Sequence, residues 1–210
     1  MMADTAENTT TGREGKREAI LEAARRVFLE VGFGATSMDA IANEARVSKQ
    51  TVYNHFGSKE ELFAAMIRSA CDRMLEALQQ AAQSGNPEET LRAVARHYMD
   101  KLFTRDRLSL YRILMAESAR FPELSSIFYE CGPKVTRKYM ADYLTEQTTR
   151  GTLRVDNPAI AAEQFIGMLT GCHFKAQLGV EAAPSQDVIN AYIESTVSLM
   201  MRAYGAGPRR

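Results

Sequence analysis

The segment between residues 45 and 59 combines basic and polar side chains and contains no acidic residue. Its basic residues are Arg46, Lys49 and Lys59. A local basic patch attracts a phosphate backbone, and neighbouring hydroxyl, amide and phenol groups can reach phosphates or base edges. The segment therefore indicates DNA binding, although short polar helical hairpins also occur in proteins that bind no DNA. The whole chain has 26 basic and 26 acidic residues, which excludes a uniformly basic coat.

Residues suited to catalysis or metal binding do not form a local motif. The chain has three histidines and three cysteines: His55, His97, His173, Cys71, Cys131 and Cys172. None of them has the spacing of a metal site or of a nucleophile with its base. We therefore expect no catalytic residue, no metal and no cofactor, and we predict that the protein is not an enzyme. The odd, widely spaced cysteines favour reduced thiols in the cytoplasm, and the longest uncharged run, residues 164–174, is too short to span a membrane.

The spacing of apolar residues predicts an all-α fold with about nine helices. Apolar side chains recur at helical spacing in successive segments from residue 16 onwards. Ser58 begins a capping-box pattern, and Asn157 followed by Pro158 predicts another helix start. Residues 1–15 are small and polar without a period, so a disordered tail is expected there.

Residues 36–56 have the lengths of a helix-turn-helix. A short helix is expected after Thr36 and Ser37, then a tight turn at residues 45–48, then a second short helix that Ser48 caps. Val52 and Phe56 are four residues apart and are expected to face a core completed by the first long helix. That leaves an outward face free to enter a major groove.

The order of residues in this region closely resembles the DNA-binding domain of TetR/AcrR-type transcriptional regulators. The pattern Tyr-x-His-Phe-x-x-Lys-x-x-Leu is present as Tyr53, His55, Phe56, Lys59 and Leu62, within a similarity that begins near Arg17 and covers about 50 residues. Residues 116–124, 151–158 and 161–165 are similar to the AefR-like subgroup. The resemblance implies a homodimer that binds double-stranded operator DNA through a domain at residues 16–60. Residues 61–210 would then bind a small-molecule effector and form the dimer.

The resemblance also implies roles for single residues. The residues expected to contact DNA are Thr36, Ser37, Lys49, Gln50, Thr51, Tyr53, Asn54, His55 and Lys59. The first two would cap the second helix and touch phosphate, the next three would lie nearest the base edges, and Asn54 would read a base. Tyr53, His55 and Lys59 would contact phosphate. An alternative for His55 is that its ring packs on the first helix.

Aromatic and methionine residues gather between residues 98 and 174, together with two polar candidates. An apolar pocket with a few polar groups would suit a small lipophilic effector. The candidate pocket residues are Tyr98, Phe103, Tyr111, Arg112, Met115, Phe128, Tyr139, Phe165, Met168 and His173. The alternative for each of them is a place in the ordinary core.

Two glycines lie one turn apart in a predicted helix, where each costs ~1 kcal/mol relative to alanine. Close helix packing would offset that loss, and in the resembled family the last two helices pair with their twofold mates. The candidate dimer residues are Gly167, Gly171, Val188, Tyr192, Val197 and Met200. The alternative is a tight helix crossing inside one subunit.

The sequence thus predicts a DNA-binding regulator, and most favours a repressor that a small molecule releases from its operator. Two other functions stay open: a DNA-binding protein that needs no effector, and an all-α protein that binds small molecules and only resembles a regulator. The sequence does not specify the operator, the effector, the regulated genes or the sign of regulation.

Overall fold

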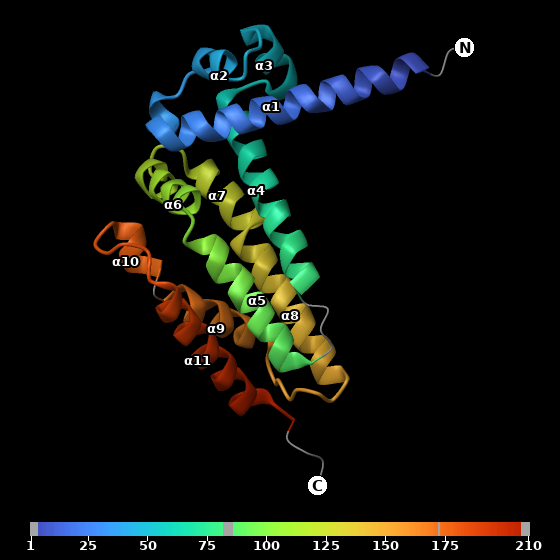
Figure 1. Cartoon of the computed structure of the whole chain (residues 1–210), viewed down its shortest axis with the longest axis vertical. Coiled ribbons are helices and arrows are strands. Elements are labelled where there is room, and N and C mark those ends of the chain that lie inside the picture. The colour runs from blue at the N-terminus through green and yellow to red at the C-terminus, as the bar shows by residue number, and fades with distance from the viewer. Residues whose placement is uncertain (1–3, 82–85, 172, 207–210) are drawn as a thin grey trace. The chain divides into compact units, whose positions relative to one another are not determined.

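The computed structural model describes residues 4–81, 86–171 and 173–206, and the chain over these residues is helical (Figure 1). The helices are α1 (Asp4–Ala35), α2 (Met38–Glu44), α3 (Lys49–Phe56), α4 (Lys59–Ala81), α5 (Pro87–Leu102), α6 (Arg105–Glu117), α7 (Pro122–Cys131), α8 (Pro133–Thr149), α9 (Pro158–Thr170), α10 (His173–Leu178) and α11 (Gln186–Tyr204). The β-structure in the described part is one isolated antiparallel bridge between Leu153 and Gly205. The predicted all-α fold is confirmed.

The described residues form eleven helices where the sequence predicted about nine, because two predicted segments are divided. The segment 122–150 divides into α7 and α8 at Gly132 and Pro133, where a break was expected, and the proline takes the first turn of α8. The helix predicted from residue 157 to about residue 177 divides into α9 and α10. The division lies next to Gly171, and glycine is a poor helix former.

The sequence predicted a disordered tail at residues 1–15; residues 1–3 lie outside the described residues, and the structure has α1 beginning at Asp4. Extending an existing helix costs much less than starting one, so polar residues can continue a helix that the apolar face after Ile20 stabilises.

The helices belong to two compact units. The first comprises residues 1–70 and 113–128, and the second comprises residues 71–112 and 129–210. The predicted domain boundary at residue 60 lies ten residues before residue 70, where the first stretch of the first unit ends. The difference arises because the start of α4 contributes to the core of the first unit. Phe63 of α4, for example, is fully buried against Phe28 and Phe33 of α1.

The first unit is built around the end of α1. Gly32 interrupts α1 with a φ of 81°, a left-handed conformation that favours glycine, and this turns Phe33 into the core. The ring of Phe33 lies 5.7 Å from that of Phe28, 5.2 Å from Phe63 and 4.8 Å from Phe121. This aromatic core supports α1 and α4 beneath the short helices α2 and α3.

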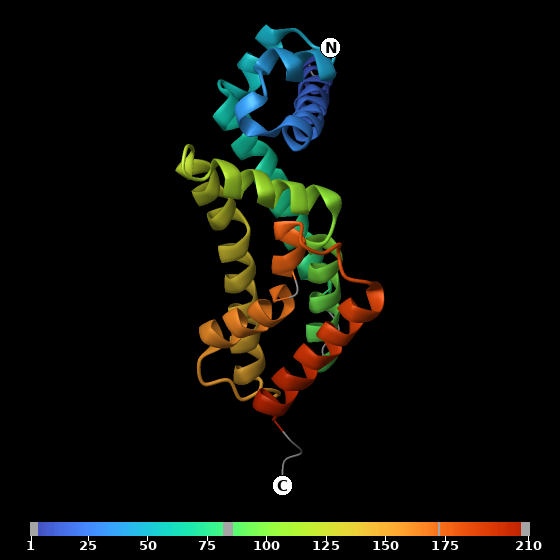
Figure 2. The same ribbon diagram turned by 90° about the vertical axis from the view of Figure 1, so that its left-hand side faces the viewer.

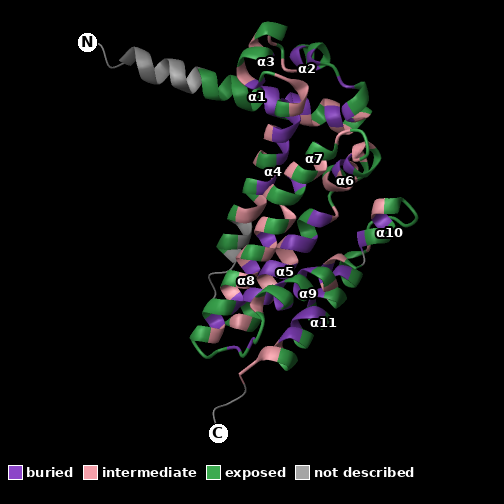
Figure 3. Ribbon diagram, turned by 180° about the vertical axis from the view of Figure 1, so that it is seen from behind, coloured by how far each residue is buried: buried purple, intermediate pink, exposed green. Residues whose placement is uncertain are grey.

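The second unit packs α8 against α9 and α5 against α11, and α9 also contacts α11 (Figure 2). Its core consists of the buried sides of these helices, among them Leu91, Met99, Leu144, Phe165 and Ile193. Helices α9 and α11 carry buried and exposed residues in alternation, so each has one face in the core and one face outside it (Figure 3).

Candidate functional site

Serine caps define the two short helices of the helix-turn-helix. The hydroxyl of Ser37 accepts a hydrogen bond from the Ala40 amide at 3.1 Å, and that of Ser48 accepts one from the Thr51 amide at 3.1 Å. Both satisfy amides that the helix itself leaves unpaired. Between the helices the Val47 amide donates to the Ala42 carbonyl at 3.0 Å, which closes the turn. The predicted helix-turn-helix is therefore present.

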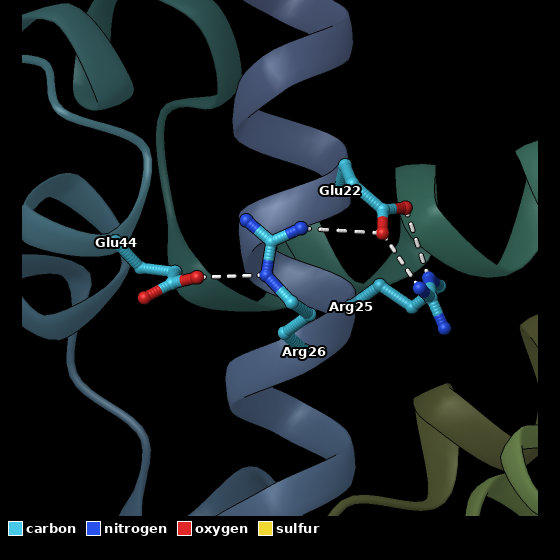
Figure 4. Close-up of polar contacts among 4 residues, drawn as sticks. All are labelled: Glu22, Arg25, Arg26 and Glu44. Carbon is cyan, nitrogen blue, oxygen red and sulfur yellow. Dashed lines mark hydrogen bonds and ion pairs between the residues drawn. The ribbon is translucent and has the colours of Figure 1, made fainter.

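Arg26 links α1 to the end of α2 (Figure 4). Its Nε lies 2.7 Å from Glu44 Oε1, and its Nη1 lies 3.3 Å from Glu22 Oε1. Glu22 also pairs with Arg25 at 2.6 Å. Exposed pairs of this kind contribute little stability, so the packing of buried residues such as Ile41 mainly holds α2 against α1.

Helix α3 has the two faces that the sequence predicts. Val52 and Phe56 are buried, whereas Lys49, Gln50 and Asn54 are exposed and Tyr53 is 40% exposed. An exposed row of amine, amide and phenol groups can donate to phosphates and pair with base edges.

Polar side chains on and around α3 bond to one another in this structure. Lys49 Nζ lies 2.9 Å from Asp39 Oδ2, and this carboxylate raises the pKa of the lysine. Gln50 Nε2 donates to Asn54 Oδ1 at 2.8 Å. These contacts are exposed and therefore weak, so DNA groups can replace them.

Thr36 and Lys59, two of the residues expected to contact DNA, have hydrogen-bond partners inside the first unit. Thr36 is buried, and its hydroxyl donates to the Gly32 carbonyl at 2.6 Å, so Ser37 alone caps α2. Lys59 Nζ donates to the carbonyls of Phe33 at 2.9 Å and Thr36 at 3.0 Å, and it lies 4.5 Å from the centroid of the Phe33 ring. Its charge is thus directed at the carboxyl end of α1, where a cation is favourable.

We expect Lys59→Ala to lower the free energy of unfolding by about 1–2 kcal/mol, because charged hydrogen bonds to helix-end carbonyls are lost. The slope of operator affinity against salt should change little. Lys49→Ala is the matched control, since that amine is exposed and should affect the salt slope rather than stability. Urea denaturation and binding at several salt concentrations measure both effects. If Lys59→Ala leaves the free energy of unfolding unchanged and reduces the slope of operator affinity against salt, Lys59 contacts phosphate.

His55 is half-buried, and its ring centroid lies 6.1 Å from that of Phe56. Burial lowers its pKa, and so do the positive charges of Arg13, Arg17 and Lys16 on α1. Arg17 also lies over Phe56, 5.4 Å from the ring centroid. This position is compatible with both predictions for His55, a contact with phosphate and a ring packed on α1. These three basic residues were not predicted from the sequence as neighbours of α3. Their spacing along one helix face was the available signal.

Three of the expected effector residues come together in the second unit. His173 is 2% exposed, and its ring centroid lies 5.2 Å from that of Phe103 and 5.1 Å from that of Tyr111. Tyr98 is buried, and its pKa is raised by burial and by the nearby Tyr111. The structure adds Arg107 and Arg137, whose positive charges act on both tyrosines. The position of Arg107, four residues before Tyr111 on one helix face, was a signal that the sequence analysis did not use.

The other expected pocket residues lie apart from this group or are part of the core. Met115 is 77% exposed, and Phe128 belongs to the first unit. Arg112 donates to the carbonyls of Ala176 and Gln177 at the end of α10. Core contacts account for Phe165, and for the partly buried Tyr139 and Met168 that pack against it. Helical spacing alone could not show which of these residues lie in the core, at the surface or in the first unit.

Burial lowers the pKa of His173 to about 4, with a backbone hydrogen bond to Leu102 opposing the shift and Arg107 adding to it. Between pH 6.5 and pH 4 the unfolded chain binds a proton here that the folded chain does not. We therefore expect the folded state to lose roughly 2–3 kcal/mol from this group as the pH falls from 7 to 4. The free energy of unfolding, measured across this pH range, should fall less steeply for His173→Phe than for the unchanged protein. If the two proteins lose stability equally with pH, His173 is not a buried neutral imidazole.

The expected dimer residues divide into two groups. Gly167, Gly171, Val188 and Tyr192 are exposed, and a methyl group built on Gly167 would meet no atom within 4 Å. A tight crossing within the subunit therefore does not explain Gly167. Val197 and Met200, in contrast, are buried in the core of the second unit and cannot face a partner. The exposed apolar face of α11 instead continues from Val188 and Tyr192 to Leu199, because these residues follow the helical repeat.

Among the described residues, no group of three or more histidine, cysteine or acidic side chains is placed to hold a metal ion. No helix formed by these residues is both long enough and apolar enough to cross a membrane.

Two family models match the chain. The model described as bacterial regulatory proteins of the tetR family matches residues 20–66, which include α2 and α3. The model described as the C-terminal domain of AefR-like transcriptional repressors matches residues 89–206. The second match covers more than half of the chain.

Relatives and solved structures agree with these models. The flavonoid-responsive regulator FrrA is 37% identical, with 94% of this chain and 100% of FrrA covered and a TM-score of 0.74. A TetR-family regulator from Mesorhizobium loti MAFF303099 is 28% identical, with 92% of this chain and 98% of that chain covered and a TM-score of 0.82. The regulator UidR from Escherichia coli K12 is 27% identical over 175 residues, 79% of this chain and 83% of UidR. The chain belongs to the TetR family of bacterial transcriptional regulators and has an AefR-like C-terminal domain.

Proposed function

We propose that the protein is a cytoplasmic, homodimeric repressor that binds operator DNA through α3 and leaves it when a small aromatic effector binds. The observation that carries the DNA-binding part is the exposed polar face of α3, which offers Lys49, Gln50, Tyr53 and Asn54 on a helix held by buried Val52 and Phe56. Basic side chains of α1 next to His55 extend the positive surface that phosphates favour.

The dimer follows from the need for two recognition helices. A single helix-turn-helix buries little surface, so such proteins bind two half-sites one or more helical turns apart. The exposed residues Gly167, Val188, Tyr192 and Leu199 of α9 and α11 are the candidates for contacts across a twofold axis. Exposed patches of this kind mark protein interfaces.

Support for an effector comes from the second unit and from one relative. Aromatic and polar side chains surround the buried His173, and FrrA, at 37% identity, is named a flavonoid-responsive regulator. An effector releases DNA only if it binds the conformer of low DNA affinity more tightly. Moving that equilibrium from 1:99 to 99:1 takes ~5.5 kcal/mol of preference.

The proposal is tested by mobility shift with the intergenic DNA beside the gene and with the flavonoid naringenin as first probe. We expect one retarded complex on a DNA fragment that carries an inverted repeat, and its loss as naringenin is added. A reporter fused to the same promoter distinguishes repression from activation. DNA binding without any effect of naringenin or of other aromatic compounds would favour the effector-independent alternative.

We expect Gln50→Ala and Asn54→Ala to relax base preference at particular operator positions, because amide side chains pair bidentately with adenine. Each should cost about 1–3 kcal/mol of discrimination at its own base pair. Gln186→Ala is the matched control, since it removes an exposed amide from α11. Binding to a library of operators with single base changes measures the effect. If both variants keep the full preference, base reading lies with Lys49, Thr51 or DNA shape.

A further inference from the structure

Polar and ionic side chains gather at the edge of the hydrophobic core of the second unit, where Tyr98 belongs to the core and Tyr111 packs against it. We define this group as the polar cluster: Tyr98, Arg107, Tyr111, Arg137 and His173. Its members come from four helices, α5, α6, α8 and α10, all within the second unit. Tyr98 and His173 are buried, and the other three are partly buried. Such residues in a domain interior need partners for their polar atoms.

The polar cluster has an excess of positive charge. Arg107 and Arg137 both lie close enough to Tyr98 and Tyr111 to lower the pKa of each hydroxyl against the stronger effect of burial. Arg107 has a side-chain hydrogen bond with Cys71, and the ion pairs found among the described residues include neither Arg107 nor Arg137. Arg137 Nη1 is buried without a hydrogen-bond partner. A guanidinium in these surroundings is best satisfied by an oxyanion, which accepts two hydrogen bonds from its planar fork.

His173 offers the opposite chemistry, a hydrogen-bond acceptor. Its ring lies between Phe103 and Tyr111, and it bonds to the backbone of Leu102. Nε2 is buried without a partner, so the bond to Leu102 uses Nδ1–H. Because the ring is neutral at pH 7, Nε2 carries a lone pair. It can therefore accept a hydrogen bond from a ligand hydroxyl.

We propose that the polar cluster binds an aromatic effector through two groups, an oxyanion held by Arg107 and Arg137 and a hydroxyl that donates to His173 Nε2. The rings of Phe103, Tyr111 and Tyr98 supply the aromatic surroundings for the body of the ligand. The inference rests on the proposed function, because it specifies the class of the effector. The oxyanion is a carboxylate or an ionised phenol.

The test measures binding of four probes to the full-length protein by titration calorimetry. The first is 6-hydroxy-2-naphthoate, which has both groups. The second, 6-hydroxy-2-naphthamide, lacks the charge, and the third, 6-methoxy-2-naphthoate, lacks the donor. The fourth, 4-nitrophenol at a pH above its own pKa, replaces the carboxylate by a phenolate. We expect the naphthoate to bind about 10- to 100-fold more tightly than the amide and at least about tenfold more tightly than the methyl ether.

Variants assign these preferences to residues. Arg107→Gln and Arg137→Gln should each reduce the preference for naphthoate over naphthamide, and His173→Phe should remove the preference for hydroxyl over methoxy. Arg105→Gln is the matched control, because it removes an exposed arginine two residues from Arg107 on the same helix. The comparison of probes on the unchanged protein needs no variant, so it remains decisive if an arginine variant fails to fold. Tight binding of 4-nitrophenolate would identify a phenolate as the oxyanion.

Equal binding of naphthoate and naphthamide, or no binding of any probe, would overturn the inference. Ordered water would then satisfy the polar cluster. The proposed function is judged separately, by operator release in the mobility shift. Operator release by an aromatic compound that has neither a carboxyl nor a phenol group would leave the proposed function standing while it excludes recognition of an oxyanion.

Discussion

Replacing Gly167 by leucine is expected to dissociate the homodimer and to abolish specific operator binding while the subunit keeps its helical content. A Cβ atom built at this exposed position has no neighbouring atom within 4 Å, so we expect the main resistance to a larger side chain to come from a partner subunit. Leucine also favours a helix by up to ~1 kcal/mol over glycine, which removes a local reason for unfolding. Overpacking costs about 1–3 kcal/mol at each site. In a twofold dimer the change occurs twice, so we expect the dimer to weaken by at least about 30-fold.

Mass in solution and operator affinity are measured on the same sample. Gly167→Ala gives a graded comparison, and Thr145→Leu, on the exposed side of α8, is the control for an added leucine. The control should remain a dimer with normal DNA binding. A dimer of normal affinity in Gly167→Leu would place the interface on α11 alone, around Val188, Tyr192 and Leu199.

Phe33→Ala is expected to lower the free energy of unfolding by about 3–5 kcal/mol, the usual range for a fully buried aromatic ring. Phe33 is 0% exposed and touches the rings of Phe28, Phe63 and Phe121, so its loss leaves a cavity between α1, α4 and the segment just before α7. The ring also lies beneath the Lys59 amine, and both hold the end of α1. Operator binding should fall with stability, since α1 supports α2 and α3.

Urea denaturation at one fixed protein concentration gives this change, because the stability of a dimer depends on concentration. Phe33→Leu is the control, as a change that keeps most of the volume should cost less than about 1.5 kcal/mol. If Phe33→Ala and Phe33→Leu are equally stable, the aromatic cluster does not hold the first unit together.

Local features of this protein could be predicted from its sequence. The caps at Ser37, Ser48 and Asn157 form as expected, with Asn157 Oδ1 accepting from the Ile160 amide at 3.1 Å. The burial of Val52 and Phe56 on α3 also follows from the helical repeat. These contacts join residues three or four positions apart, so the local chain already contains both partners. The order of residues around α3 likewise identified the family, which residues 20–66 and 89–206 confirm.

Tertiary structure alone decided which partners the longer side chains take. The carbonyls that Lys59 contacts lie 23 and 26 residues earlier in the chain, and Val197 and Met200 are buried because α11 packs against α5 and α9. Arg107 and Arg137 approach the same two tyrosines from different helices. Periodicity shows that a helix has an apolar face, but what covers that face depends on how distant helices pack. The sequence therefore determined the family and the DNA-reading helix, while packing between distant segments decided the surroundings of Lys59, the exposed face of α11 and the polar cluster.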